Sequence, residues 1–443
     1  MLDEVAIRKH VEYAHGQFHG YVDIGSGNSD DSAPVAKDAL VLMAVSADQS
    51  WKIPLGYFLI NGMSGEERAN LINQCLQKLH DVGVRAVSLT CDGPSCHFAM
   101  MRHLGAKLNI SGMDPCFPHP ADETQRVHII LDVCHMLKLL RNSFAEGGLF
   151  RTSDGRTVRW QYIEELNKLQ RTEGLRLGNK LRNAHMQWKK QKMKVNLAAQ
   201  VFSASVADAI EFCDKELKLP QFMRCEATIE FLRHIDRAFD VLNSRNPLGN
   251  GFKAPMKKTN KDRWEKILHN ATTFLMGLKD GAGTPMYQGP RKTAFSGFAA
   301  SIHSIKKLFS ELIDSVGAPM KYLLTYKFSQ DHIELFFAAV RSSGGFNNNP
   351  TARQFQATYK RLLMRHQVKN GSGNCGIMDC TSILPVDSTA GTSQSTMSIA
   401  RKYDMINRQP SQNDHDYADA PNFETVSCTK RLQLVTLLVT WFE

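Results

Sequence analysis

The sequence predicts a mixed α/β fold that is interrupted by a long, mostly helical segment. Short runs of β-branched and aliphatic residues, bounded by turn-forming residues, alternate with helical patterns up to about residue 131. From about residue 140 to 320 the apolar residues recur at helical spacing instead. Two more helical patterns follow between residues 331 and 365. The simplest arrangement is a sheet with flanking helices into which a helical region is inserted.

The composition is that of a globular protein. The chain has 443 residues, a formal net charge of +10, and 42% hydrophobic and 22% charged residues, and at about 100 to 200 residues per domain this length predicts two to four domains. No apolar run approaches the ~20 residues of a membrane span. The first residues also lack a basic region followed by an apolar stretch. These observations argue against the membrane and secreted classes, and the positive charge is compatible with a polyanionic partner.

The ten cysteines lack the dense spacing of a disulfide scaffold, so we expect reduced thiols in an intracellular compartment. Two groups resemble half of a zinc site, namely Cys91 with Cys96 and His97, and Cys375 with Cys380. Neither has a second Cys/His pair at finger-like spacing, which favours buried or incidental cysteines over structural zinc.

Strands are expected in the first part of the chain, because three runs of strand-forming residues end at clusters of turn formers: 18–24, 39–45 and 53–60. Ser64 can cap the helix that follows, since Glu66 and Glu67 would then stand in its first turn, where carboxylates stabilise the helix dipole. An apolar stripe carries this helix to Gly83.

Two later strands each deliver a carboxylate. The β-branched run over 84–91 predicts a strand that ends on Asp92, and the run over 127–131 predicts a short buried strand that ends on Asp132. Residues 98–104 have a helical pattern between them.

Long helices with basic faces are expected through the middle of the chain, over 162–169, 178–192, 197–217, 227–242 and 261–278. Two further helices, 331–340 and 351–365, are separated by a turn-rich stretch in which Asn349 can cap and Pro350 can occupy the first helical position. Beyond residue 370 the Gly, Ser, Thr, Asn and Asp content predicts a linker or disordered tail.

Three acidic residues stand out by their settings. Asp3 lies near the N-terminus, Asp92 ends a strand, and Glu334 lies in a helix rich in Leu and Phe. Carboxylates from two neighbouring strand ends and a helix packed across the sheet would make a costly cluster of negative charge unless divalent cations neutralise it. Such a site suits two Mg²⁺ ions, roughly 3.5 to 4 Å apart, for phosphodiester displacement. Taken singly, each acid fits a solvated surface residue or a helix cap better than a metal ligand, and only the apolar setting of Glu334 weighs against this for one of them.

The segment around Glu334 resembles a known family. Ser-Gln-Asp-His-Ile-Glu-Leu-Phe-Phe at 329–337, followed by Arg-Ser-Ser-Gly-Gly-Phe-Asn-Asn-Asn-Pro-Thr at 341–351, is similar to the C-terminal catalytic segment of the P-element/THAP-domain transposases. Supporting segments occur in the family's order at 3–9, 20–23, 90–93, 132–142, 192–200 and 239–244. The likeness spans roughly residues 1 to 366.

The resemblance implies an RNase H-like mixed sheet with flanking helices, interrupted by a helical GTP-binding insertion, in a Mg²⁺-dependent DNA transposase that cuts and rejoins DNA. By motif position Asp3, Asp92 and Glu334 would be the first, second and third acidic ligands. The expected division is 1–138 and 323–370 for the RNase H-like domain, 139–322 for the insertion, and 371–443 for a low-complexity linker and C-terminal segment. DNA, GTP and further copies of the chain are the implied partners, and the nucleus is the implied location.

Two features of the resemblance carry alternatives. Asp132 with His135 matches a family motif, but a strand-end Asp that caps the following helix is an equal interpretation. The zinc module expected at the start of a complete family member is absent, and the chain begins two residues before Asp3. We therefore expect a fragment or an N-terminally truncated chain.

The sequence excludes an ordinary P-loop GTPase. Residues 174–180 are one residue short of that loop and lack its hydroxyl, and residues 260–262 lack the spacer of the usual guanine-reading motif. The resemblance points to a different guanine pocket at 239–243. There Phe239 would stack on the base, Asp240 would accept from the guanine N1 and N2 hydrogens, and Asn243 would share that face.

Three more residues are assigned to the nucleotide. Lys180 would contact a phosphate, Ser205 would place a hydroxyl at the nucleotide-bound Mg²⁺, and Asp331 would serve the same metal. A run of cations between residues 171 and 194 fits either phosphate contacts or a solvated helix face: Arg171, Arg176, Lys180, Arg182, Lys189, Lys190, Lys192 and Lys194.

Three functions compete. The leading one is a P-element-like transposase core, favoured by intact Asp92 and Glu334. The second is a domesticated or decayed derivative that binds DNA, GTP or protein without catalysis, favoured by the short start and the low-complexity end. The third is an RNase H-like nuclease without transposition, which would need no GTP pocket.

Overall fold

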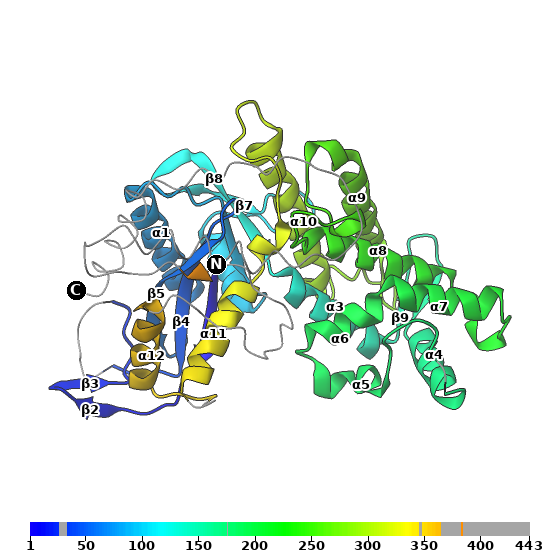
Figure 1. Cartoon of the computed structure of the whole chain (residues 1–443), viewed down its shortest axis with the longest axis horizontal. Helices are drawn as coiled ribbons and strands as arrows, with labels where there is room; N and C mark the ends of the chain where they lie inside the picture. Colours follow the sequence, from blue (N-terminus) through cyan, green and yellow to red (C-terminus); the bar gives the residue numbers. More distant parts are fainter. Residues whose placement is uncertain (26–32, 175, 345–347, 365–381, 384–443) are drawn as a thin grey trace, which may run out of the picture.

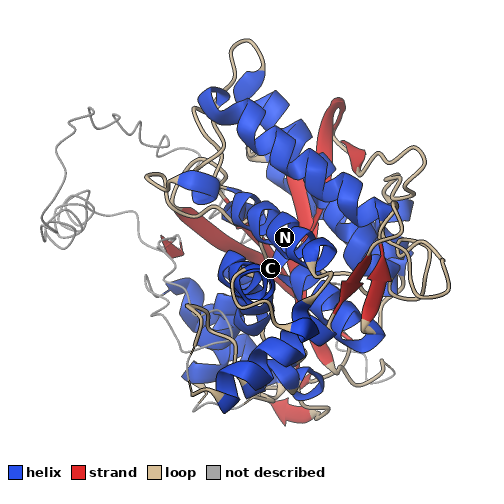
Figure 2. Cartoon of the chain, turned by 90° about the vertical axis from the view of Figure 1, so that its right-hand side faces the viewer, coloured by secondary structure: helices blue, strands red, loops and turns tan. Residues whose placement is uncertain are grey.

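The computed structural model describes residues 1–25, 33–174, 176–344, 348–364 and 382–383. In Figure 1 the N-terminus and most strands lie on the left, and the green helices of the middle of the chain lie on the right. Figure 2 shows from the side that helices flank the strands. The sheet and helical parts predicted from the sequence are therefore both present.

One sheet has the order β1-β4-β5-β11, formed by Leu2–Ala6, Asp38–Val45, Trp51–Ile60 and Ser382–Ile383. The pairs β1–β4 and β4–β5 are antiparallel, while β11 runs parallel to β5. Strands β4 and β5 confirm the predicted strands 39–45 and 53–60. A small hairpin, β2 (Glu12–Ala14) with β3 (Gln17–His19), lies in the connection between β1 and β4.

Strand β4 is buried on both faces. Leu40 and Leu42 join the core that contains helix α1 (Gly65–Asp81), whereas Val41 and Met43 join the core of α11 (Asp331–Ser343) and α12 (Ala352–Met364). Successive side chains of a strand point to opposite faces, so helices that cover both faces produce this alternation. Glu334 is thereby carried by a helix that packs directly on the sheet.

A second sheet has the order β6-β8-β7, formed by Ser88–Cys91, Asp122–Leu131 and Cys116–His119. Strand β6 is parallel to β8 and lies beside β1. The two parallel strands end together, since Asp132 N–H donates to Cys91 O at 2.9 Å. Strand β6 begins later than the predicted strand over 84–91, and β8 begins earlier than 127–131.

Helix α1 begins as its sequence predicts, because Ser64 caps it in a reciprocal pair of bonds with Glu67. Helix α2 (Ser95–His103) confirms a helix in the predicted segment 98–104 but begins three residues earlier. Helix α12 differs, because it starts one residue after Thr351. Thr351 Oγ1 accepts from Gln354 N–H at 3.3 Å and Gln354 Oε1 accepts from Thr351 N–H at 3.0 Å, so the expected capping by Asn349 with Pro350 at the first helical position is wrong.

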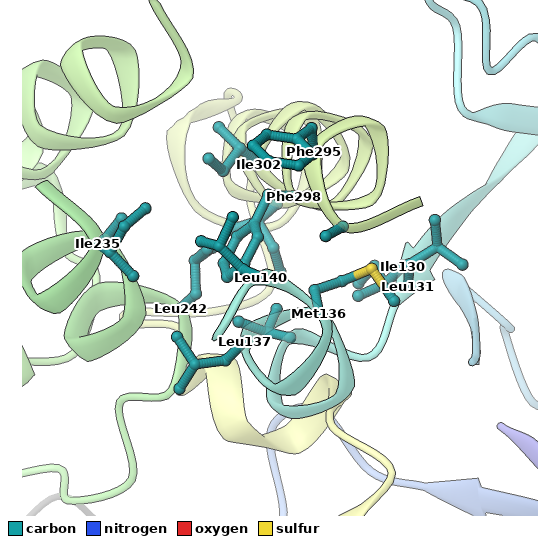
Figure 3. Close-up of a cluster of buried hydrophobic side chains, with 14 of the residues drawn as sticks. Ile130, Leu131, Met136, Leu137, Leu140, Ile235, Leu242, Phe295, Phe298 and Ile302 are labelled. Carbon is teal, nitrogen blue, oxygen red and sulfur yellow. The ribbon is translucent and has the colours of Figure 1, made fainter. Parts of the chain in front are cut away.

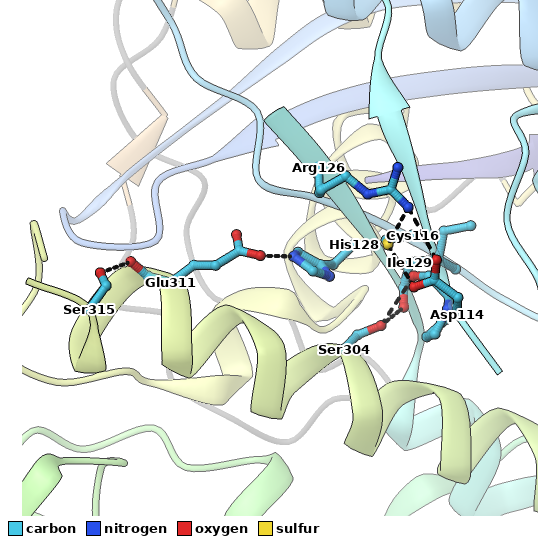
Figure 4. A network of polar contacts seen from close by, with 9 residues as sticks. Asp114, Cys116, Arg126, His128, Ile129, Ser304, Glu311 and Ser315 are labelled. Atoms are coloured by element: carbon cyan, nitrogen blue, oxygen red, sulfur yellow. Dashed lines mark hydrogen bonds and ion pairs between the residues drawn. The ribbon is translucent and has the colours of Figure 1, made fainter. Parts of the chain in front are cut away.

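Helix α10 (Lys292–Phe309), which was not predicted as a separate helix, joins the sheet part and the helical part of the molecule. Figure 3 shows Phe295, Phe298 and Ile302 of α10 facing α3 (Val133–Gly147), β8 and α8 (Glu226–Leu242). Polar bonds add to this apolar contact. Ser304 Oγ donates to Ile129 O at 2.5 Å, and the contact between Glu311 Oε1 and His128 Nε2 is 2.8 Å (Figure 4).

The insertion consists of a small hairpin, β9 (Leu149–Arg151) with β10 (Thr157–Arg159), and helices α4 to α9. Their bounds are Gln161–Thr172, Asn183–Met186, Val195–Phe202, Ala204–Lys215, Glu226–Leu242 and Lys261–Gly277. Helices α4, α8 and α9 confirm the segments predicted over 162–169, 227–242 and 261–278.

Two predicted helices are corrected. The prediction of one helix over 178–192 is wrong, because this segment holds only the short helix α5 and a 3₁₀ turn at Trp188–Gln191. There the buried His185 accepts from Arg182 N–H at 3.0 Å and its Nε2 lies 3.0 Å from Gln200 Oε1, so tertiary contacts replace helical ones. The helix over 197–217 is two helices, α6 and α7, which break at the extended residue Ser203.

Most of the predicted linker from residue 371 onward lies outside the described residues. Within the part of the chain that the structure describes, no helix has the length and apolarity needed to cross a membrane.

Candidate functional site

Asp3, Asp92 and Glu334 come together in the fold. Asp3 lies on β1, Asp92 follows β6, and Glu334 lies in the first turn of α11. Burial and then the charge of Asp92, with smaller effects of Glu334 and Asp132, raise the pKa of Asp3 to about 8, against one bond from Glu4 N–H. Because charge–charge energies fall with distance, these shifts mark four carboxyl groups that share one partly buried neighbourhood.

The segment before α11 holds this neighbourhood in place. Gln330 N–H donates to Asp132 Oδ1 at 3.0 Å, and Gln330 Nε2 donates to Leu2 O at 2.8 Å. Thr90 Oγ1 donates to Phe328 O at 3.0 Å. The start of α11 is thus bonded to β1, to β6 and to the end of β8. Sequence reasoning missed Gln330 and Thr90 as positioning residues, because such long-range bonds leave no local pattern.

Asp132 caps α3, as one of the two interpretations predicted. Its Oδ2 accepts from His135 N–H at 2.7 Å, while Oδ1 is taken by Gln330. Burial, followed by the charges of Asp331 and Glu334, raises the pKa of Asp132 to about 7, although the two N–H donors oppose this rise. Both oxygens are therefore engaged in joining β8, α3 and α11.

Asp92 differs from Asp3 in its charge state. Burial alone would raise its pKa, but the contact of His97 Nδ1 with Asp92 Oδ1, 2.7 Å long, and the charges of His97 and His135 lower the pKa below its usual value. Asp92 is thus an anion at neutral pH, while Asp3 keeps its proton. His97 is a second residue that sequence reasoning missed in this role, having weighed it only as a zinc ligand.

The donor set fits a hard divalent cation in chemistry, since it consists of carboxylates. Among the described residues, however, no three His, Cys, Asp or Glu side chains are arranged so that they could hold a metal ion. Cys91, Cys96 and His97, the possible half of a zinc site, therefore do not form such an arrangement either. The ligand roles of Asp3, Asp92 and Glu334 stay a prediction.

A pocket of about 470 Å³ in the insertion gathers five of the six residues assigned to the nucleotide: Lys180, Ser205, Phe239, Asp240 and Asn243. They come from the segment before α5, the first turn of α7 and the end of α8. The volume lies within the usual ~300 to 1,000 Å³ of small-molecule sites. Asp331 is not among the lining residues. Its carboxylate forms an ion pair with Arg245, which does line the pocket.

The pocket is lined by both acidic and basic side chains. Burial, followed by the charge of Asp240, raises the pKa of Asp236 to about 6, and burial raises the pKa of Asp240 against Lys253, which lies 3.8 Å away. Asn243 Oδ1 is buried and has no hydrogen-bond partner among the described residues. A buried acceptor in this state is suited to a donor from a ligand.

The basic run lies outside this pocket, apart from Lys180. The Nζ atoms of Lys189 and Lys192 lie 5.7 and 5.9 Å from the centre of the Trp188 ring. Both lysines are exposed. Their exposure fits both a phosphate-binding surface and a solvated face.

Comparison with known proteins identifies the family. Three domain models match the chain in order: the TNP-like RNase H N-terminal domain at residues 1–105, the TNP-like GTP-binding insertion domain at 134–255, and the TNP-like RNase H C-terminal domain at 326–360. Human DNA transposase THAP9 is 35% identical over 352 residues, which are 79% of this chain and 39% of THAP9. The chain belongs to the P-element/THAP9 transposase family.

A second member of the P-element/THAP9 family is more distant. The Drosophila melanogaster transposable element P transposase is 26% identical over 323 residues, which are 71% of this chain and 40% of that protein. This chain therefore spans about two fifths of the length of both relatives.

A solved structure confirms the fold. The Drosophila P element transposase strand transfer complex matches with a TM-score of 0.68 and 24% identity, covering 84% of this chain and 76% of that one. The predicted RNase H-like mixed sheet with a helical GTP-binding insertion domain is thus confirmed.

Proposed function

We propose that this chain is the core of a P-element-like DNA transposase that cleaves and transfers DNA strands with Mg²⁺ and with GTP as a bound cofactor. The observation that carries the proposal is the meeting of Asp3, Asp92 and Glu334, from opposite ends of the insertion, in one partly buried and charge-coupled neighbourhood. Family membership supplies the reaction class, and transposon ends and target DNA are the proposed substrates.

Asp3, Asp92 and Glu334 would hold the metal ions. When bound, such ions activate a water or a 3′-hydroxyl and stabilise the leaving oxygen. The chain's own part is positional: His97 orients Asp92, and Gln330 fixes α11 against β1 and Asp132. Asp3, whose pKa is raised to about 8, releases a proton when a cation is bound beside it.

The pocket in the insertion would hold GTP. Phe239 supplies a ring for the base, and Asp240 and the unsatisfied Asn243 Oδ1 supply acceptors for guanine N–H groups, which adenine does not match. Lys180 and the first turn of α7 suit the phosphates, and Ser205 suits their metal. DNA contact by the basic run, assembly into a homo-oligomer and a nuclear location complete the proposal.

Nicking of plasmid DNA that carries element ends tests the catalytic part. We expect nicking that requires Mg²⁺ or Mn²⁺ and that Glu334→Gln abolishes without changing the thermal unfolding midpoint. Glu164→Gln, on α4 of the insertion, is the matched control and should retain activity. Full activity of Glu334→Gln would refute the assignment.

Titration with labelled nucleotides tests the pocket. Asp240→Ala should weaken GTP binding at least tenfold, because it removes an acceptor for two guanine N–H groups. Asp262→Ala, on α9 and outside the pocket, should leave the affinity unchanged. Equal affinity of the unaltered chain for GTP and ATP would defeat the guanine assignment.

The second candidate is a non-catalytic derivative that binds DNA and GTP. The lack of a three-ligand metal arrangement among the described residues favours it. It predicts GTP and DNA binding without metal-dependent nicking, so the two experiments above separate the candidates.

A further inference from the structure

We propose that Arg245 couples occupancy of the insertion pocket to the position of the helix that carries Glu334, by pairing with Asp331. This inference rests on the nucleotide pocket proposed above. It gives Asp331 a role as the partner of Arg245, in place of the role of a nucleotide-metal ligand that the resemblance implied.

Arg245 lies between the pocket and the helix that carries Glu334. It follows the end of α8 by three residues and lines the pocket together with Asp240 and Asn243. Its Nη2 forms an ion pair with Asp331 Oδ2, and its guanidinium lies 5.6 Å from the centre of the Tyr326 ring. Asp331 is the first residue of α11, and only 8% of its side chain is exposed.

Asp331 is placed to control Glu334. The two residues are three positions apart, which puts them on one face of α11. The charge of Asp331 also raises the pKa of Asp132. Asp132 Oδ1 accepts from Gln330 N–H at the start of the same helix. A change in the pairing of Asp331 therefore acts on the helix at the point where it is bonded to the sheet.

Neutral bonds tie the same junction together. Thr325 Oγ1 accepts from Ser244 N–H at 2.9 Å and donates to Val241 O at 2.6 Å. Tyr326 N–H donates to Ser244 O at 3.2 Å. Ser244 and Thr325 are both buried. The end of α8, which carries the pocket residues, and the segment that leads into α11 thus form one bonded unit.

The chemistry of a guanidinium allows it to serve both partners. It has five N–H donors in a planar fork, and a carboxylate occupies only part of them. An anionic ligand in the pocket, such as a nucleotide phosphate, can take the others and fix the fork in one orientation. With the pocket empty, the fork is held from the Asp331 side alone. Nucleotide binding is therefore expected to reduce the motion of the start of α11.

Hydrogen exchange of the intact chain tests the coupling. Saturating GTP with Mg²⁺ should slow exchange of the α11 amides at least threefold in the unaltered chain. In Arg245→Gln, measured at GTP concentrations that saturate that variant, the slowing of α11 should vanish while slowing around the pocket persists. Arg237→Gln is the matched control, since Arg237 is exposed on α8 and does not line the pocket.

A double-mutant cycle on the GTP dissociation constant separates the two roles of Asp331. If Asp331 acts through Arg245, Asp331→Asn combined with Arg245→Gln weakens GTP binding no more than the stronger single variant. The double variant also leaves no unpaired charge, so it provides a folded background. Additive losses, with the loss from Asp331→Asn present only with Mg²⁺, would identify a metal ligand and overturn the coupling.

The remaining outcomes are equally decisive. GTP-induced slowing of α11 that survives in Arg245→Gln overturns the coupling and leaves the pocket assignment intact. An unaltered chain that binds no GTP overturns both the pocket assignment and this inference.

Discussion

Removing one hydroxyl should weaken the junction between the insertion and α11, the helix that carries Glu334. Thr325→Val keeps the shape of the side chain and deletes Oγ1, which accepts from Ser244 N–H and donates to Val241 O. The Thr325 side chain is buried, so water cannot replace these bonds. A buried polar group left without its partner costs about 1 to 3 kcal/mol, and with two groups affected we expect a loss of about 2 to 6 kcal/mol in the free energy of unfolding.

Urea unfolding followed by fluorescence measures this loss. Thr273→Val is the matched control, because Thr273 is exposed on α9 and the substitution should change the free energy of unfolding by less than about 0.5 kcal/mol. The unfolding slope should be the same in both variants. If Thr325→Val were as stable as the unaltered chain, the Thr325 hydroxyl would contribute nothing to the junction between α8 and the segment before α11, and the reasoning would be refuted.

Two further predictions concern charge. The folded chain binds the Asp3 proton more tightly than the unfolded chain, because the pKa of Asp3 is raised from 3.8 to about 8 in the folded chain. The stabilisation that protonated Asp3 provides is therefore complete below pH 4 and is lost as the pH rises toward 8. The free energy of unfolding then falls by at most about 1.4 kcal/mol per pH unit. Asp3→Asn should flatten this dependence in metal-free urea unfolding at pH 5 to 8, and an unchanged slope would contradict it. The second prediction concerns four lysines of the basic run, which are replaced by Gln: Lys189, Lys190, Lys192 and Lys194. The slope of log DNA affinity against log salt concentration should become shallower by about 0.9 per lost phosphate contact. The control Lys168→Gln should leave this slope unchanged, and an unchanged slope in the fourfold variant would favour the solvated-face interpretation.

Local chemistry explains which elements the sequence predicts well. The helix after Ser64 is recognisable because its cap and first-turn acids are neighbours in the chain. Strands β4 and β5 are recognisable because helices cover both faces and make the runs continuously apolar. The predicted helix over 178–192 does not form, because the burial of His185 and Trp188 within the insertion outweighs the helical propensity of this segment.

The candidate site shows the same division. The family motifs contain Asp92 and Glu334, and the resemblance places five pocket residues that do line one pocket. Arg245 was beyond reach, because an ion pair between residues 86 positions apart leaves no periodic trace in either segment. His97 was missed for a different reason: it lies only five residues from Asp92, but its contact with that carboxylate depends on how the turn between β6 and α2 orients the start of α2.

The placement of the insertion explains why such long-range pairs arise. The chain leaves the sheet at Asp132, where α3 begins, and returns to it at Gln330, where α11 begins. These two points are bonded directly, since Gln330 N–H donates to Asp132 Oδ1. A displacement of the insertion must therefore act across this bond, and Glu334 lies within one helical turn of it. An insertion at this position can influence the helix that carries Glu334 from a distance, which supports the coupling proposed between its pocket and that helix.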